Sequence, residues 1–171
     1  RGTAEWPCRV IEIQEIGYDR PGVERPSSDR IAERVIRVLT DFWPRGSDVM
    51  HIHNPTLAKN RQFLQIIKRL QHAGVNLFLQ IHDFAEDGRP NAYFRQPYPE
   101  DCHYGVINQR DRKVLLRAGL QPEGLHWIPN IVPPLPRRPG APRPAGGLLY
   151  PVRAIRRKNI GEAILLSLLV P

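Results

Sequence analysis

Short apolar or β-rich runs alternate along the chain with longer stretches in which apolar residues recur at helical spacing. The first kind of pattern predicts strands and the second predicts helices. Predicted strands cover residues 8–16, 48–53, 75–81, 103–107, 125–128 and 147–151. Repeated alternation of strands and helices is typical of a parallel sheet with helices on both faces, so the sequence predicts an α/β, Rossmann-like fold.

Most of the predicted helices begin at a residue that is a good N-cap. Side chains of Ser and Asn can accept a hydrogen bond from the first free amide groups of a helix, and proline fits the first helical position. A glutamate three residues after the cap completes a capping-box pattern. The expected starts are Ser27 or Ser28, Asn54 followed by Pro55, Asn108, and Asn159 with Glu162 behind it.

Composition limits the class of protein. A chain of 171 residues with 41% apolar residues can bury one good core. We therefore expect one full domain, with room for a short part of a second domain. Its two cysteines, Cys8 and Cys102, are too few for a disulfide scaffold, so we expect a reduced, cytoplasmic setting. The sequence has neither a run long enough to span a bilayer nor the apolar core of a signal peptide.

The chain changes character near residue 133. The stretch 133–146 is PPLPRRPGAPRPAG, which forms neither helix nor sheet ladder and is predicted to be a semi-rigid linker. Both ends of the chain are expected to be cuts through a larger protein. We therefore predict one domain over 1–132 and the start of another over 147–171.

The net charge of +8 favours an anionic partner. Much of the excess lies late in the chain, in RRPGAPRP and VRAIRRKN, so the positive charge is local. Nucleic acid, an anionic membrane surface and a phosphorylated small molecule are all compatible with it.

Two groups of polar residues follow predicted strands, where ligands of open parallel sheets bind. His51, His53 and Asn54 end the strand 48–53, with His51 interpreted as a core histidine and Asn54 as a cap. His82 and Asp83 follow the strand 75–81. A neutral imidazole at a strand tip can hydrogen-bond a sugar hydroxyl or stabilise charge, and an adjacent carboxylate can orient it.

A third group is cationic. Arg153 and Lys158 lie on either side of the predicted turn that leads to the helix beginning at Asn159. Two cations beside a helix N-terminus suit a phosphate or diphosphate. The alternative is a solvated basic loop, to which Arg156 and Arg157 are assigned.

The ordered series DVMHIHNP, LFLQIHDF, GVINQRDRKVLLRAGL, LHWIPNIV and LLYPVRAIRRKNIGEAI resembles family-4 retaining glycosyltransferases of the two-domain GT-B fold. The resemblance begins at about Asp48 and covers the rest of the chain. It implies that residues 1–132 are an acceptor-side Rossmann-like domain, incomplete at its N-terminus. Residues 147–171 would be the first strand and helix of a truncated donor-binding domain.

The resemblance also implies roles for individual residues. His82 would be the catalytic histidine that faces the donor sugar, and Arg153 and Lys158 would hold the donor diphosphate. His53, Asp83 and Asn130 would contact the sugar or the acceptor. Two departures are Val152 and Ile131, each at a position where the family usually has glycine.

The same resemblance implies the partners. They are a nucleotide-sugar donor as substrate and an unidentified saccharide or lipid-linked acceptor, with no cofactor, no bound metal and no specific nucleic acid. Peripheral association with a membrane is compatible with it. The family's donor-side pair of glutamates would lie beyond Pro171.

Two other classes remain open from the sequence. A metal-dependent hydrolase is the enzyme alternative, because His51 and His53 resemble a strand-end histidine pair to which His82 could add a ligand. A basic nucleic-acid-binding protein is the second, supported by charge alone, since the sequence has no helix-turn-helix, zinc-finger or RNP signature.

Overall fold

The computed structural model describes residues 8–84, 90–131, 149–154 and 158–169. The chain divides into two compact units, Arg1–Asn130 and Ile131–Pro171. Each unit is described by itself below.

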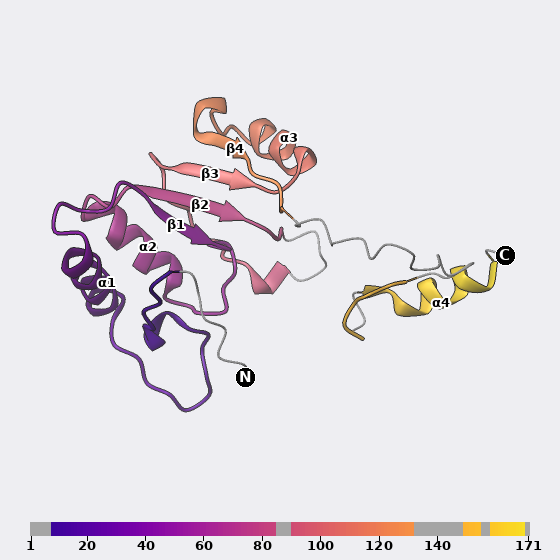
Figure 1. Cartoon of the computed structure of the whole chain (residues 1–171), viewed down its shortest axis with the longest axis horizontal. Helices are drawn as coiled ribbons and strands as arrows, with labels where there is room; N and C mark the ends of the chain where they lie inside the picture. Colours follow the sequence, from indigo (N-terminus) through magenta and orange to yellow (C-terminus); the bar gives the residue numbers. More distant parts are fainter. Residues whose placement is uncertain (1–7, 85–89, 132–148, 155–157, 170–171) are drawn as a thin grey trace, which may run out of the picture. The chain divides into compact units, whose positions relative to one another are not determined.

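The first unit is built on a parallel sheet (Figure 1). Its strands pair in chain order, and the registers align Ile52 with Leu79, Leu79 with Tyr104 and Tyr104 with Leu125. This arrangement confirms an α/β fold with a parallel sheet, compatible with a Rossmann-like domain. The strands are β1 (Met50–His53), β2 (Leu77–Ile81), β3 (His103–Val106) and β4 (Leu125–Trp127).

Three α-helices accompany this sheet. They are α1 (Ser28–Phe42), α2 (Phe63–His72) and α3 (Gln109–Arg117). The predicted caps hold at α1, where the Ser27 side chain accepts from the Arg30 amide at 3.4 Å, and at α3, where Asn108 accepts from the Asp111 amide at 2.8 Å. Short 3₁₀ turns complete the unit at η1 (Gln14–Ile16), η3 (Pro90–Ala92) and η4 (Pro122–Gly124).

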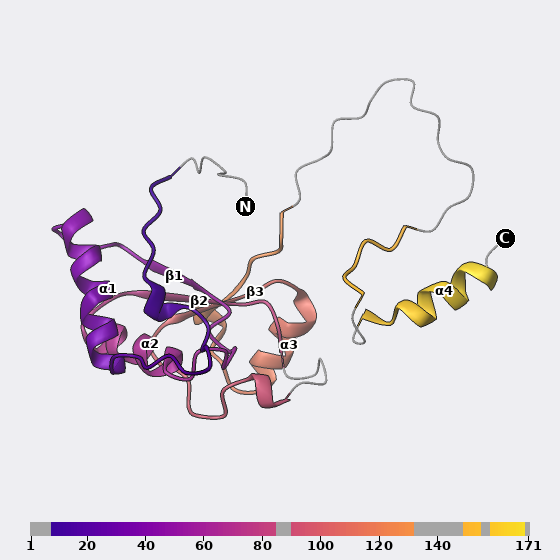
Figure 2. The ribbon, with the colours of Figure 1, turned by 90° about the horizontal axis from the view of Figure 1, so that it is seen from below.

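The helices α2 and α3 lie on the same face of the sheet. Because the strands follow the order β1-β2-β3-β4, every connection moves the chain one position in the same direction. Crossovers between parallel strands are right-handed, so steps in one direction place their helices on one face. Figure 2 shows this arrangement. Within the first unit, the prediction of helices on both faces is therefore wrong for α2 and α3.

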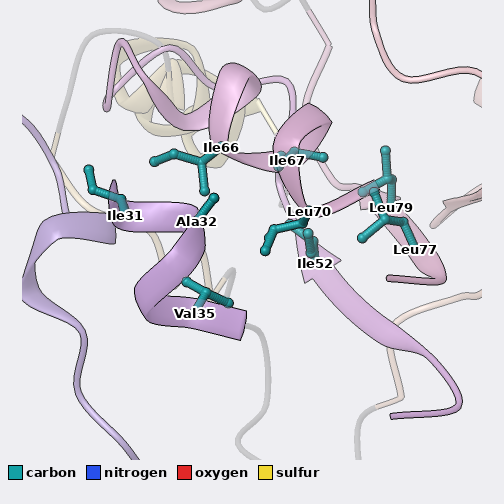
Figure 3. Packing of buried hydrophobic residues seen from close by; sticks show 9 residues of the cluster. All are labelled: Ile31, Ala32, Val35, Ile52, Ile66, Ile67, Leu70, Leu77 and Leu79. Atoms are coloured by element: carbon teal, nitrogen blue, oxygen red, sulfur yellow. The ribbon is translucent and has the colours of Figure 1, made fainter. Parts of the chain in front are cut away.

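The core lies between this face and the helices (Figure 3). Its residues come from α1, α2, β1 and β2, and full burial of one such aliphatic side chain contributes about 1.5–3 kcal/mol. They are Ile31, Ala32, Val35, Ile52, Ile66, Ile67, Leu70, Leu77 and Leu79. A second cluster joins Ile81, Val106 and Leu125 to Leu115 and Leu116 of α3.

The structure corrects the prediction of a strand at residues 8–16. This segment carries only the turn η1, and Val10 and Ile11 are 63% and 42% exposed. Ile13 and Ile16 instead pack at the border of the core. The apolar residues of this segment therefore contact the core without belonging to the sheet.

The predicted helix start at Asn54 and Pro55 is also wrong. Asn54 has a φ of 53°, and α2 begins only at Phe63. Between them the chain makes turns and one isolated bridge from Leu57 to Tyr93. Asn54 is placed in this loop because it tolerates the left-handed conformation better than most residues.

In the second unit the described residues form α4 (Ile160–Leu169) and an irregular segment over 149–154. Residues 149–151 are not in a strand, which corrects that part of the predicted strand 147–151. Asn159 has a φ of 48°, unlike the extended conformation usual for an N-cap. The linker 133–146 lies outside the described residues, and the predicted domain boundaries stay a prediction.

None of the helices in the described part of the chain is long and apolar enough to cross a membrane.

Candidate active site

The carboxyl ends of β1 and β2 bring two histidines together. His53 is the last residue of β1 and pairs in register with Gln80, while His82 follows β2 directly. Their ring nitrogens, Nδ1 of His53 and Nε2 of His82, are 3.0 Å apart. The prediction that these two histidines share the carboxyl edge of the sheet is confirmed.

His51 lies on the same face of β1 as His53, two residues earlier. The rings of His51 and His53 are stacked with centroids 4.3 Å apart. Nε2 of His51 is 2.9 Å from Oε1 of Gln80, a side chain that is only 4% exposed. His51 itself is exposed, so its interpretation as a core histidine is wrong. α2 and α3 lie on the opposite face, and on its own face His51 contacts the rings of His53 and Phe78.

Asn54 connects the loops that follow the two strands. Its side-chain oxygen accepts a hydrogen bond from the His82 amide at 3.1 Å, and its own amide donates to the Gln80 carbonyl at 2.8 Å. The Thr56 hydroxyl adds a longer bond of 3.4 Å to the Asp83 carbonyl. These bonds fix the backbone from which the His82 ring projects.

The histidine pair has a defined protonation chemistry. Burial lowers the pKa of His53 below its usual value, and the nearby His51 and His82 lower it further as like charges. A neutral imidazole donates with one nitrogen and accepts with the other, so the His53–His82 contact needs one proton between the rings. A ring nitrogen of the pair that is not used in this contact can hydrogen-bond a hydroxyl.

The other residues predicted for this edge are placed less directly. Asp83 is half-buried and lines a pocket of about 860 Å³ on the helix side, together with Phe84, Tyr93 and Leu115 among others. The side chain that contacts the His82 ring is that of His53, whereas the sequence predicts that the carboxylate of Asp83 orients this ring.

Asn130 follows β4 and is exposed. The chain after β4 turns back toward β2, because the Gln80 side chain donates a hydrogen bond to the Ile128 carbonyl at 3.5 Å. A contact of Asn130 with the sugar or the acceptor stays a prediction.

The cations predicted for a phosphate site belong to the second unit. Arg153 is exposed and Lys158 is half-buried. The Lys158 carbonyl accepts a hydrogen bond from the Tyr150 hydroxyl at 2.8 Å. Arg156 and Arg157 lie outside the described residues, as does most of the turn between Arg153 and Lys158. Their convergence on an anion therefore stays a prediction.

Three or more metal-ligating side chains do not gather anywhere in the described residues in a way that could hold a metal ion. His51, His53 and His82 are neighbours but do not form a group of this kind, and a catalytic zinc site needs three protein ligands. The metal-dependent hydrolase is not favoured by this arrangement.

The sequence did not single out every residue that the structure places here. The sequence predicts Gln80 only as part of an apolar strand and Asn54 only as a cap. It gives no sign that His103 on β3 and His126 on β4 lie 2.9 Å apart. A polar residue within an otherwise apolar strand is the signal that could have found Gln80.

The chain is similar to a curated protein, the mannosylglucosyl-3-phosphoglycerate synthase of Petrotoga mobilis. The two are 29% identical over 191 aligned positions, which cover 92% of this chain and 37% of that protein. This chain thus spans little more than a third of its relative's length. No family model and no solved structure matches it. The similarity to a synthase of a glycosylated compound supports sugar transfer as the general class of reaction.

Proposed function

We propose that this chain is part of a retaining glycosyltransferase of the GT-B fold that transfers a sugar from a nucleotide-sugar donor. The observation that carries the proposal is the similarity, over 92% of the chain, to a synthase whose product is named as a glycosylated phosphoglycerate. The carboxyl edge of the sheet, where His53 and His82 meet, is the place where such a domain binds ligands.

In this proposal His82 faces the donor sugar and acts as the catalytic histidine. His53 holds the His82 ring through their 3.0 Å contact, and Asn54 holds its backbone. Asp83 and Asn130 are assigned to the sugar or the acceptor. Arg153 and Lys158 bind the donor diphosphate and stabilise the charge that develops on it as it leaves.

The acceptor class follows from the relative's name. We take a phosphorylated glycerate carrying a glucosyl group as the first acceptor to test, with a mannosyl nucleotide as the first donor. An anionic acceptor agrees with the net charge of +8. A cytoplasmic setting is part of the proposal, since Cys8 and Cys102 are both free thiols.

The test uses the full product of the gene that encodes this chain. Release of nucleoside diphosphate is measured with mannosyl and glucosyl nucleotides and with glucosyl-3-phosphoglycerate, and NMR of the product reports the anomeric configuration. We expect acceptor-dependent release and a retained configuration. Hydrolysis alone, an inverted product or no turnover with any donor would contradict the proposal.

The diphosphate site has its own test in the same assay. Arg153→Ala and Lys158→Ala should each lower kcat by about 100-fold or more, because each removes a cation aimed at the leaving diphosphate. Arg156→Ala and Arg157→Ala are the matched controls and should have small effects, because the proposal gives these two residues no contact with the diphosphate. Equal losses from all four variants would indicate a generic basic patch.

A further inference from the structure

Within the first unit, α2 and α3 lie on one face of the sheet, and a row of aromatic rings lies on the other face. His51, Phe78 and His126 follow one another across the strands, with ring centroids 5.0 Å and 5.6 Å apart. His103 continues the row at 5.0 Å from His126. Gly105 makes room for it, because a Cβ atom there would lie 2.7 Å from the Phe78 ring. This row continues away from the His53–His82 pair toward the other edge of the sheet.

His103 and His126 form a second hydrogen-bonded pair of imidazoles at the far end of the row. Nδ1 of His103 is 2.9 Å from Nε2 of His126. His103 is the first residue of β3, and His126 pairs in register with Gly105. Both backbones are held by the sheet, so the separation of the two rings follows from the register. His103 is exposed and His126 is half-buried, which leaves the pair open to solvent.

This separation is also the one that a chelated ion requires. Imidazole nitrogens bind Zn²⁺ at about 2.0–2.1 Å, so two of them at angles between 90° and tetrahedral lie about 2.9–3.4 Å apart. Neutral imidazole is a preferred ligand of Zn²⁺, Cu²⁺ and Ni²⁺. The two rings would need to turn about their side-chain bonds to aim both lone pairs at one point, and no strand would have to move.

We propose that His103 and His126 form a binding site for a divalent transition ion, with Zn²⁺ as the first candidate and water completing its coordination. On binding, the imidazole that donates the present hydrogen bond loses the proton from its facing nitrogen and takes one up from water on its other ring nitrogen, so that both facing nitrogens become ligands and both rings stay neutral. The site is distinct from the His53–His82 edge and does not depend on the proposed sugar transfer.

Such an ion would fasten β4 to the sheet. β4 is a three-residue edge strand, and its neighbour in the sheet is β3. It inserts Leu125 into the second core cluster, and Gly124 before it lies near the Cys102 carbonyl. A bond through the ion between His103 and His126 joins the two strands on the face opposite that cluster. Binding to the folded state alone would raise the melting temperature.

The experiment is isothermal titration of Zn²⁺ at pH 7.5 into this 171-residue chain carrying His53→Gln and His82→Gln, which removes the other histidine pair. We expect saturable binding of one equivalent and a rise in Tm. Adding His126→Gln, or His103→Gln, should abolish the saturable binding. His72→Gln is the matched control, since His72 lies at the end of α2, and it should leave the titration unchanged.

Circular dichroism without metal checks that each variant folds. If either the His103 or the His126 variant fails to fold, the other one still tests the site. Long-range ¹H–¹⁵N spectra should show that Zn²⁺ shifts Nδ1 of His103 and Nε2 of His126. Absence of saturable binding in the His53→Gln/His82→Gln chain would overturn the proposal. Binding that survives loss of either ligand in a folded variant would overturn it equally.

Discussion

The Nδ1 atom of His53 lies 3.0 Å from the Nε2 atom of His82, although the two residues are 29 apart in the sequence. Parallel pairing of β1 with β2 produces this contact, because it brings the carboxyl ends of both strands to the same edge. His51 stacks on His53 from two residues earlier on β1, and Asn54 holds the loop that carries His82. The result is a set of three imidazoles on two adjacent strands.

The acid–base behaviour of His53 gives the first prediction. Its pKa should lie below the ordinary 6.5, because burial and the like charges of His51 and His82 disfavour the imidazolium. The stability that His53 contributes is then complete above pH 6.5, the ordinary value, and is lost as the pH falls through the lowered value. Titration of the ring by ¹H–¹⁵N NMR measures this pKa.

The same titration in the His82→Gln and His51→Gln variants separates the causes. Each variant removes one like charge, so the pKa of His53 should move upward toward its ordinary value in both. A pKa of His53 at or above 6.5 in the unaltered chain would contradict the account of its environment.

Asn54 gives a second prediction, on the loop that carries His82. Asn54→Gly and Asn54→Ala both remove the acceptor of the His82 amide, but only alanine is strained at a φ of 53°. Asn54→Ala should therefore be about 1–2 kcal/mol less stable than Asn54→Gly in urea unfolding. In both variants the His82 amide should exchange its hydrogen faster. Equal stability of the two variants would show that the left-handed conformation at Asn54 is wrong.

The core gives a third prediction. Ile67 is 0% exposed and packs in the cluster between α1, α2 and the sheet, so Ile67→Ala should lower the free energy of unfolding by about 2–5 kcal/mol. Val114 in α3 is 45% exposed, and Val114→Ala should change it by about 0.5 kcal/mol or less. Urea unfolding of the 171-residue chain measures both. Similar losses from the two variants would contradict the described packing.

Much of the first unit could be predicted from the sequence. Apolar runs of strand length located β1 to β4, and their alternation with helical stretches predicted the parallel pairing that joins His53 to His82. The caps Ser27 and Asn108 were found because a cap depends only on residues close by in the sequence. These features follow from local patterns together with the general rule for parallel sheets.

Other features depend on contacts that the sequence pattern does not contain. Asn54 followed by Pro55 is the pattern of a helix start, yet the backbone of Asn54 is left-handed. Its side chain instead holds the backbone of His82, which follows the neighbouring strand. The contact of His103 with His126 depends on the register between β3 and β4, which a count of apolar positions does not give. The single covered face follows from the order of the strands in space, and alternation alone does not fix that order.

His82→Ala in the full gene product tests most directly whether the histidine at the tip of β2 takes part in sugar transfer. Its kcat for acceptor-dependent release of nucleoside diphosphate should fall by about 100-fold to 1,000-fold, because a group that stabilises charge in the transition state is lost. His72→Ala, which alters an exposed histidine at the end of α2, should leave the rate unchanged. A folded His82→Ala protein that transfers sugar at the unaltered rate would contradict the account.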